Sequence, residues 1–185
     1  FSLHIDHAPR RSQNRLTEEF PQAIAEMPIA AFRNEADTDW SLPQNSTWAS
    51  LIAQRGTECW RSQTIPLVVA GEERTSGGRR SCLNPSQPHE PICDYSLATE
   101  RDVEEAVAMA ASDPTGWRSL PLDDRQRILG EVARELRRSR GDLIHAAMIN
   151  GGKLISESDP EVSEAIDFVE YYRAAARRFH RLPTI

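Results

Sequence analysis

The second half of the chain shows the periodicity of amphipathic helices and contains no continuous apolar run that suits a buried strand. Four helices are predicted between Thr99 and Arg181, separated by breaks at residues 113–116, at Gly141 and at residues 151–152. Nothing in this pattern resembles the strands of a parallel sheet. If the chain is part of an α/β protein, we therefore expect the sheet that these helices cover to lie beyond its last residue.

Each predicted helix has a recognisable start. Thr99 is followed three residues later by Asp102, as in a capping box. Pro121 suits the first turn of a second helix, which we expect to end near Arg140. Asp142 can cap a third helix, and Asp159-Pro160 is predicted to begin the last one. The positions expected on the inner faces of the first two helices are Val103, Ala106, Val107 and Ala110, then Ile128, Leu129, Val132 and Leu136.

The first 98 residues are less regular. A polar arm is predicted at the start, with a candidate helix from Leu16 to Glu26. A short helix follows, with Asn45 or Ser46 as its N-cap and Trp48 and Ile52 on its apolar face. Short extended segments come next, with Gly77-Gly78 as a hairpin turn. The sequence thus predicts a mixed α and β, mostly helical fold in three parts: arm and short helices at 1–60, short antiparallel strands at 61–98, and helices at 99–185.

Charge and hydropathy exclude several classes of partner. The formal net charge is −6, which makes the chain a poor candidate for binding nucleic acid or an anionic membrane. Arg137, Arg138 and Arg140 lie where the dipole of a helix end favours cations, which argues against a nucleic-acid patch. No apolar run reaches the roughly 18 residues of a membrane span. The first residues also lack the apolar segment of a signal peptide, so we expect a cytoplasmic protein.

The residues that usually carry chemistry form no site on their own. Cys59, Cys82 and Cys93 have no metal-binding spacing, and we expect structural, reduced thiols. His4 and His7 could share one helix face, but their place in the N-terminal arm argues against a metal site. No glycine-rich loop follows a predicted strand, so no dinucleotide site is predicted. From the residues alone, we expect no catalytic, cofactor-binding or metal-binding position in this chain.

The last predicted helix places a carboxylate beside aromatic rings. The main apolar face of this helix is predicted at Val162, Ala165, Ile166, Val169 and Ala176, and Phe168, Tyr171 and Ala175 form a stripe that flanks it. Glu164 lies in line with this stripe at i, i+4 and i+7 spacing. From the pattern, Glu164 is either a solvent-exposed residue at the rim of the helix or an anion held among aromatic rings to bind a ligand. The pattern alone favours the first interpretation and leaves the second open.

Two segments are distinctive: FRNEADTDWSLPQN at residues 32–45 and DPEVSEAIDFVEYY at residues 159–172. Together with several landmarks between them, they resemble the N-terminal part of the aldehyde dehydrogenase superfamily. Within it they are most similar to the 1-pyrroline-5-carboxylate dehydrogenase branch, found as a free-standing enzyme or as the second half of bifunctional proline utilization A. The landmarks are Asn84-Pro85, DVEEAVAMA at residues 102–110, Trp117, Pro121, Arg125, Ile128-Leu129 and Gly152-Lys153.

The resemblance implies a fold and an activity. The chain would be the N-terminal portion of an aldehyde dehydrogenase fold, with helices that flank an NAD-binding sheet located further along. The whole protein would oxidise 1-pyrroline-5-carboxylate, or glutamate γ-semialdehyde, to glutamate with NAD in proline catabolism, as a homo-oligomer. The family's catalytic Cys, general-base Glu and cofactor-binding strands also lie further along. We therefore expect the isolated chain to be inactive and to bind no cofactor.

Two site residues follow from the resemblance. Glu164 matches the helix carboxylate that, in this branch, reaches the α-amino group of the substrate. Phe168 is its neighbour and a candidate for the wall of the substrate pocket. One departure is visible, because Asn150 stands where the family usually has a Glu three residues before the lysine, here Lys153. The alternative hypothesis is a non-enzymatic helical protein-interaction module, which the lack of a nucleophile and of a cofactor loop supports.

Overall fold

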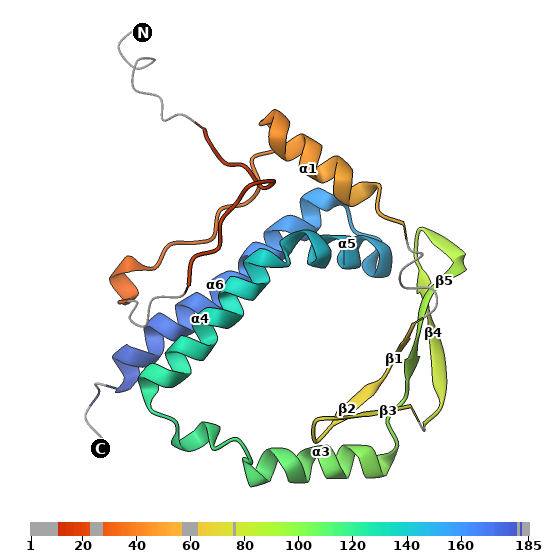
Figure 1. The fold of residues 1–185 in the computed structure, drawn as a ribbon, viewed down its shortest axis with the longest axis vertical. Coiled ribbons are helices and arrows are strands. Elements are labelled where there is room, and N and C mark those ends of the chain that lie inside the picture. The colour runs from red at the N-terminus through yellow and green to blue at the C-terminus, as the bar shows by residue number, and fades with distance from the viewer. Residues whose placement is uncertain (1–10, 23–27, 57–62, 76, 181, 183–185) are drawn as a thin grey trace, which may run out of the picture.

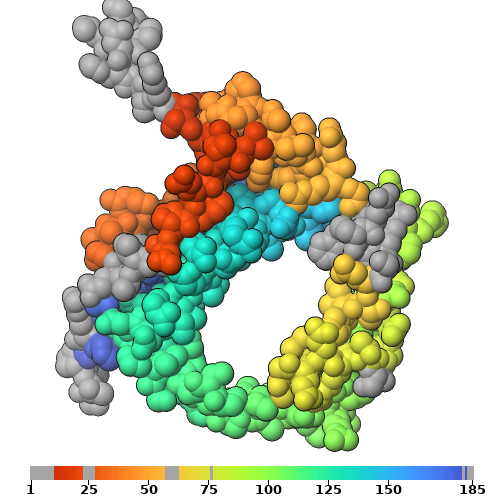
Figure 2. Space-filling model, viewed as in Figure 1, coloured from red at the N-terminus to blue at the C-terminus, as the bar shows by residue number. Residues whose placement is uncertain are grey.

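The computed structural model describes residues 11–22, 28–56, 63–75, 77–180 and 182. Its elements form an open ring, with α1, α4, α5 and α6 on one side and the strands on the other (Figure 1). Figure 2 shows the opening that this ring surrounds. In chain order the elements are η2 (Ile29–Ala31), α1 (Pro43–Ala53), β1 (Thr64–Ile65), β2 (Leu67–Val69), β3 (Glu72–Arg74), β4 (Arg79–Asn84), β5 (Gln87–Ser96), α3 (Glu100–Ser112), η3 (Trp117–Ser119), α4 (Leu122–Arg138), α5 (Arg140–Gly151) and α6 (Ile155–His180).

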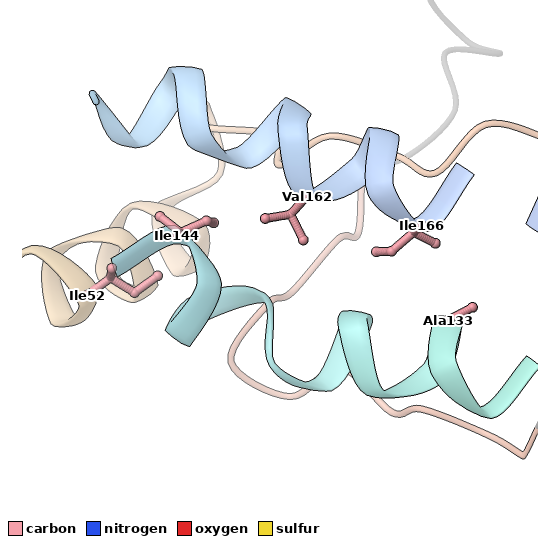
Figure 3. Packing of buried hydrophobic residues seen from close by; sticks show 5 residues of the cluster. All are labelled: Ile52, Ala133, Ile144, Val162 and Ile166. Carbon is pink, nitrogen blue, oxygen red and sulfur yellow. The ribbon is translucent and has the colours of Figure 1, made fainter. Parts of the chain in front are cut away.

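The hydrophobic core lies in the helical side of the ring. The longest helix, α6, packs against both α4 and α5, and α1 packs against α5 (Figure 1). One buried cluster joins all four helices, and none of its side chains is more than 7% exposed. The cluster consists of Ile52, Ala133, Ile144, Val162 and Ile166 (Figure 3). The predicted apolar faces of α1 and α6 are therefore confirmed at Ile52, Val162 and Ile166.

The strands form two small sheets. β4 and β5 pair antiparallel, and β1 adds to β5 in parallel, which gives the order β1-β5-β4. β2 and β3 form a separate hairpin, whose turn is Ala70-Gly71 with positive φ at both residues. The predicted hairpin turn at Gly77-Gly78 is wrong, because the strands on either side of it belong to different sheets. Gly77 is needed for another reason, since a Cβ there would lie 2.1 Å from the carbonyl oxygen of Leu97.

Several helix boundaries differ from those predicted. Gly141 lies inside α5 rather than ending the preceding helix, and the break falls at Ser139. A Cβ on Gly141 would lie 3.5 Å from both Trp48 and Ile52, which is an ordinary van der Waals contact, so Gly141 lies where α1 packs on α5. Helix α6 begins at Ile155 and carries Pro160 within it. Among the helix starts, the capping box of Thr99 and Asp102 is confirmed.

The N-terminal expectations are also revised. The N-cap of α1 is Leu42, with Pro43 in the first turn, and Asn45 is instead a buried residue that binds the arm. Residues 16–22 of the predicted arm helix contain no helix, and residues 23–26 lie outside the described residues. His4, His7 and Cys59 also lie outside them.

The predicted inner face of α3 is exposed, whereas that of α4 is confirmed only in part, since Leu136 packs against the core. Val103 and Val107 on α3 are 54% and 64% exposed. On α4, Ile128 and Val132 are exposed as well, whereas the buried positions are Gln126, Gly130 and Ala133. The contact between α4 and α6 is therefore made mainly by these three residues, whereas Ile128 and Val132 are exposed. Helices α3 and α4 therefore present apolar side chains that nothing in the described residues covers.

Candidate functional site

Glu164 lies on an exposed turn of α6, between the two ends of the helix. Among the described residues, no hydrogen bond or ion pair engages its carboxylate. Glu161, one turn earlier on the helix, differs because its carboxylate pairs with the ammonium group of Lys153. The side chain of Glu164 is exposed to solvent, although the neighbouring Ser163 is buried. Glu164 is thus a carboxylate on a long helix, and none of the described cations pairs with it.

One turn further along α6, aromatic rings form a continuous group. The rings of Phe168 and Tyr172 stack with their centroids 6.3 Å apart. Tyr171 packs edge-on against Tyr172 at 5.8 Å, and Phe32 of the arm packs edge-on against Tyr171 at 5.5 Å. Phe168 remains 54% exposed. The sequence placed Phe168 and Tyr171 together on one stripe, but Phe32 and Tyr172 were missed as members of this group.

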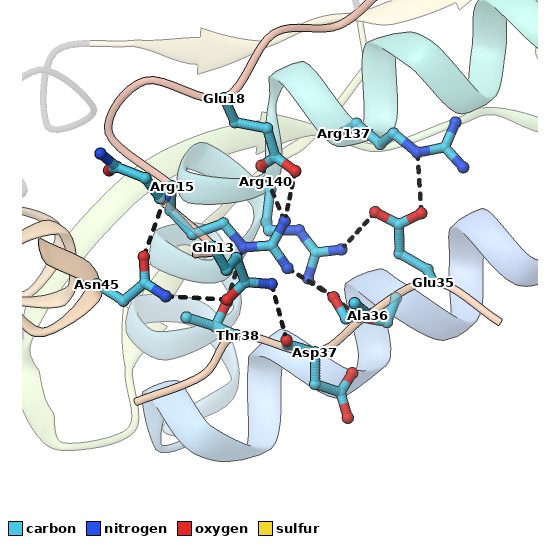
Figure 4. Close-up of polar contacts among 12 residues, drawn as sticks. Gln13, Arg15, Glu18, Glu35, Ala36, Asp37, Thr38, Asn45, Arg137 and Arg140 are labelled. Carbon is cyan, nitrogen blue, oxygen red and sulfur yellow. Dashed lines mark hydrogen bonds and ion pairs between the residues drawn. The ribbon is translucent and has the colours of Figure 1, made fainter. Parts of the chain in front are cut away.

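The arm is fastened to the helices by a network of charges (Figure 4). Glu35 accepts from Arg137 Nε at 2.9 Å and from Arg140 at 3.2 Å, so one carboxylate joins the arm to the ends of α4 and α5. Burial by itself would lower the pKa of Arg137, but the charges of Glu35 and Glu170 raise it above its usual value. The sequence predicted only that these arginines favour a helix end. The structure shows that Arg137 and Arg140 also bind the arm through Glu35.

A second group of contacts joins the arm directly to α6. Asp159 accepts from the backbone N–H of Thr38 at 2.6 Å and from Arg140 at 2.8 Å, and its side chain is fully buried. Asp167 accepts from Asn34 at 2.7 Å and from the backbone N–H of Glu35 at 2.6 Å. These carboxylates lie before and after Glu164 in the sequence of α6. The arm therefore fixes the stretch of α6 that carries Glu164.

The arm is itself organised by Arg15 (Figure 4). Its backbone N–H donates to Asn45 Oδ1 at 3.0 Å. Its guanidinium donates to Thr38 Oγ1 at 3.1 Å, to the carbonyl oxygen of Ala36 at 2.6 Å and to Glu18. Sequence periodicity could not find this network, because its members lie far apart along the chain. The only available signal was the dense run of polar residues at 32–45.

Residues 72–184 match the aldehyde dehydrogenase family. The chain therefore belongs to the aldehyde dehydrogenase family. It is 29% identical over 144 residues to the 1-pyrroline-5-carboxylate dehydrogenase of Staphylococcus aureus (strain MW2), a match that covers 78% of this chain and 28% of that protein. The chain thus spans less than a third of the length of that relative.

Solved structures agree with this assignment. The 1-pyrroline-5-carboxylate dehydrogenase from Thermus with bound NAD superposes with a TM-score of 0.75 at 29% identity, over 83% of this chain and 30% of that one. Proline utilization A from Bdellovibrio bacteriovorus superposes with a TM-score of 0.73 at 26% identity, over 84% of this chain and 16% of that one. The expected mixed fold, the N-terminal portion of an aldehyde dehydrogenase, is confirmed. None of the described helices has the length and apolar composition needed to cross a membrane.

Proposed function

We propose that this chain is part of a dehydrogenase that oxidises 1-pyrroline-5-carboxylate, as glutamate γ-semialdehyde, to glutamate. The observation that carries the proposal is the unpaired carboxylate of Glu164 beside an aromatic group, on a helix of an aldehyde dehydrogenase fold. The similarity to proteins named 1-pyrroline-5-carboxylate dehydrogenase supports the same substrate. The parent protein is proposed to act in proline catabolism, in the cytoplasm, as a homo-oligomer.

In this proposal Glu164 binds the α-amino group of the substrate. Glutamate γ-semialdehyde carries a cationic amine, and a fixed carboxylate is its natural partner in a charge-assisted hydrogen bond. The charge of Glu164 is available, since no described residue pairs with it. The arm supports this role indirectly, because Asp159 and Asp167 tie the same helix to residues 34–38 on both sides of Glu164.

Phe168 is proposed as part of the pocket wall. Its ring stacks on Tyr172 one turn beyond Glu164 and is more than half exposed, so a large apolar surface is free to meet a substrate or another segment of the protein. An apolar wall lowers the local dielectric and strengthens the contact between Glu164 and an amine. Tyr172 and Phe32 would then act by holding the aromatic group in place.

The similarity to an NAD-bound structure supports NAD as the cofactor of the parent protein. The described residues do not fit a dinucleotide, because none of their strands leads through a glycine-rich turn into a helix N-terminus. We assign the cofactor contacts and the catalytic Cys to sequence outside these 185 residues. Residues 99–185 would form the helical start of the NAD-binding domain, after strands at 61–98 and the arm at 1–60. The isolated chain is expected to produce no NADH from the substrate.

The test is the Glu164→Gln variant in the complete dehydrogenase. Losing one charge-assisted hydrogen bond costs on the order of 1.5–3 kcal/mol, which lowers kcat/KM by roughly tenfold to over a hundredfold. We expect this loss with glutamate γ-semialdehyde and little change with simple aldehydes that lack the α-amino group. An equal loss with both substrates would mean that Glu164 orients the helix rather than binds the amine.

The matched control is Glu161→Gln, one turn earlier on α6, whose carboxylate already pairs with Lys153. We expect this variant to leave kcat/KM nearly unchanged for both classes of substrate.

The coding sequence beyond Ile185 distinguishes the dehydrogenase from the rival function, a helical interaction module. A dehydrogenase requires a strand-rich continuation with a cofactor loop and a Cys, whereas a stop codon at that point would favour the module.

A further inference from the structure

A cavity of about 510 Å³ lies between the three-stranded sheet and α5. Its wall is mostly apolar, with Ile65, Ile92 and Tyr95 from the strands and Ile149 from the helix. Two cysteines, Cys82 on β4 and Cys93 on β5, also line it. Neither is bonded to another cysteine. Nothing in the proposed dehydrogenase activity uses this pair of thiols.

Cys82 and Cys93 are direct partners across the antiparallel pair β4–β5. Residues opposite each other project to the same face of the sheet, so both thiols point to the cavity side. Leu97 N donates to the carbonyl oxygen of Gly78, and this pairing repeats at every second residue, which makes Cys82 and Cys93 a hydrogen-bonded pair. Such pairs have Cα atoms about 5.5 Å apart, within the range that a disulfide spans.

The two thiols differ in access. Cys93 is 6% exposed, and burial raises its pKa, with smaller contributions from Cys82 and Asp94. Cys82 is only partly buried and belongs to β4, the edge strand of the sheet. Its thiol donates to Asn150 Oδ1 at 2.8 Å, near the end of α5. Cys82 is therefore the thiol that a reagent in solution meets first, and Cys93 is held behind it.

We propose that Cys82 and Cys93 form a dithiol modification site, which reacts with small disulfides such as oxidised glutathione and closes to an intrachain cross-strand disulfide. The Cys82 thiolate attacks one sulfur of oxidised glutathione, and the first glutathione leaves as a thiol. The Cys93 thiolate then attacks the sulfur of Cys82 and releases the second glutathione. The two cysteines lose two electrons and two protons, and the two glutathione molecules gain them.

Closure has a structural consequence beyond the hairpin. The sulfur of Cys82 carries no proton once it is in a disulfide, so it can no longer donate to Asn150. This hydrogen bond between β4 and α5 is lost at the same time as β4 and β5 become covalently joined. Oxidation therefore replaces a hydrogen bond between the sheet and α5 with a covalent bond between β4 and β5.

The experiment uses the 185-residue chain with Cys59→Ser, equilibrated in buffers of reduced and oxidised glutathione. The ratio of disulfide to dithiol in each buffer gives the effective concentration of the Cys82 and Cys93 thiols toward each other. Intact mass spectrometry reports the loss of two hydrogens, and proteolytic mapping locates the bond. We expect an effective concentration at least tenfold above that of the same chain in guanidinium, where a short flexible loop gives roughly millimolar values. With Cys93→Ser, a glutathione adduct should accumulate on Cys82, whereas Cys82→Ser should give little adduct on Cys93.

The register provides a matched control. Moving the first thiol by one residue, with Ser81→Cys and Cys82→Ser together, places it on the opposite face of β4 and should abolish the advantage over the unfolded chain. Far-UV circular dichroism verifies that each variant folds. The proposal is overturned if the folded pair closes no better than in guanidinium, if the shifted pair closes equally well, or if the disulfide joins different chains in proportion to protein concentration.

Discussion

The helical side of the molecule and the side formed by the strands and α3 are held together in different ways. On the helical side, side chains from four helices share one buried cluster, and the Arg140–Asp159 pair is 3% and 0% exposed. On the other side, Arg74 of β3 joins the strands to α3, since it binds Asp102 at 3.2 Å and Glu105 at 2.8 Å. The apolar residues Val103 and Val107 of α3 stay exposed.

The difference shows which parts of this chain complete their own packing. The arm, α1, α5 and α6 pair buried charged groups and share one buried cluster with α4 within the described residues, although Ile128 and Val132 of α4 remain exposed. The strands and α3 have backbone pairing and ion pairs but leave apolar side chains in solvent. An amphipathic helix is stabilised chiefly by burying its apolar face. Helix α3 therefore resembles an element whose partner belongs to the rest of an aldehyde dehydrogenase.

The largest effect is expected at the buried ion pair. Asp159→Ala removes the nearer of the two carboxylates that bind the buried Arg140 and leaves only Glu35, and breaking such a buried pair costs about 3–5 kcal/mol. We expect the helical side to lose that much stability in urea unfolding followed by far-UV circular dichroism. The control is Asp142→Ala, which removes an exposed pair with Arg55 and should cost less than about 1 kcal/mol. Equal losses of stability in the two variants would mean that the buried Arg140–Asp159 pair contributes no more than an exposed ion pair.

The apolar positions provide the second comparison. Ile144→Ala empties a fully buried site and is expected to cost about 2–5 kcal/mol. Val107→Ala removes a side chain that is 64% exposed, so its cost should be only a few tenths of a kcal/mol. Both values come from the same urea titrations. If Val107→Ala proves as costly as Ile144→Ala, α3 is packed against a partner in solution, such as a second copy of the chain.

The two regions also differ in how well the sequence predicted them. The capping box at Thr99 and the core positions of α1 and α6 were found, because they depend on neighbouring residues and on local periodicity. The arm network was missed, because Glu35 and Asp159 are separated by more than a hundred residues. Gly141 was interpreted as a helix stop, although it lies inside α5, where α1 packs on that helix. The inner face of α4 was predicted correctly at Leu136 but not at Ile128 and Val132, because periodicity could not show that Gln126, Gly130 and Ala133 face α6.

The candidate site shows the same division. Periodicity put Glu164 in line with Phe168, and the structure keeps that alignment on α6. No local pattern predicted that Phe32, from the arm, would pack on Tyr171. The choice between a bound substrate and open solvent for Glu164 also depends on sequence that these residues do not include. It is therefore the resemblance, rather than the pattern, that gives Glu164 a proposed role.

The third prediction tests the strand region alone. In Gly77→Ala the new Cβ would lie 2.1 Å from a backbone oxygen of Leu97, so the chain must shift at the start of β4. We expect a cost of about 1–3 kcal/mol, as for other overpacked sites, seen as faster hydrogen exchange in β4 and β5. Gly78→Ala is the control, because its Cβ would be 3.5 Å from a side chain of Leu97. Similar exchange in both variants would refute the close approach at Gly77.

The smallest effect is expected at the start of α3 and depends on pH. The pKa of Asp102 lies below its usual value of 3.8, chiefly because the Thr99 hydroxyl donates to its carboxylate, with the Thr99 backbone N–H and Arg74 adding to the effect. A lowered pKa stabilises the folded state above pH 3.8, and this contribution is lost as the pH falls through the folded value. Thr99→Ala removes the largest cause, so the pKa of Asp102 should rise toward 3.8.

At neutral pH, Thr99→Ala should cost about 1 kcal/mol through loss of the cap. The difference from the unsubstituted chain should shrink below the folded pKa of Asp102, where that carboxyl is protonated in both proteins. Far-UV circular dichroism at a series of pH values measures the stability, and NMR titration of Asp102 measures the pKa. Thr115→Ala, at an exposed position in the following loop, is the control. A difference that stays constant down to the lowest pH would show that Thr99 acts through packing and not through the charge of Asp102.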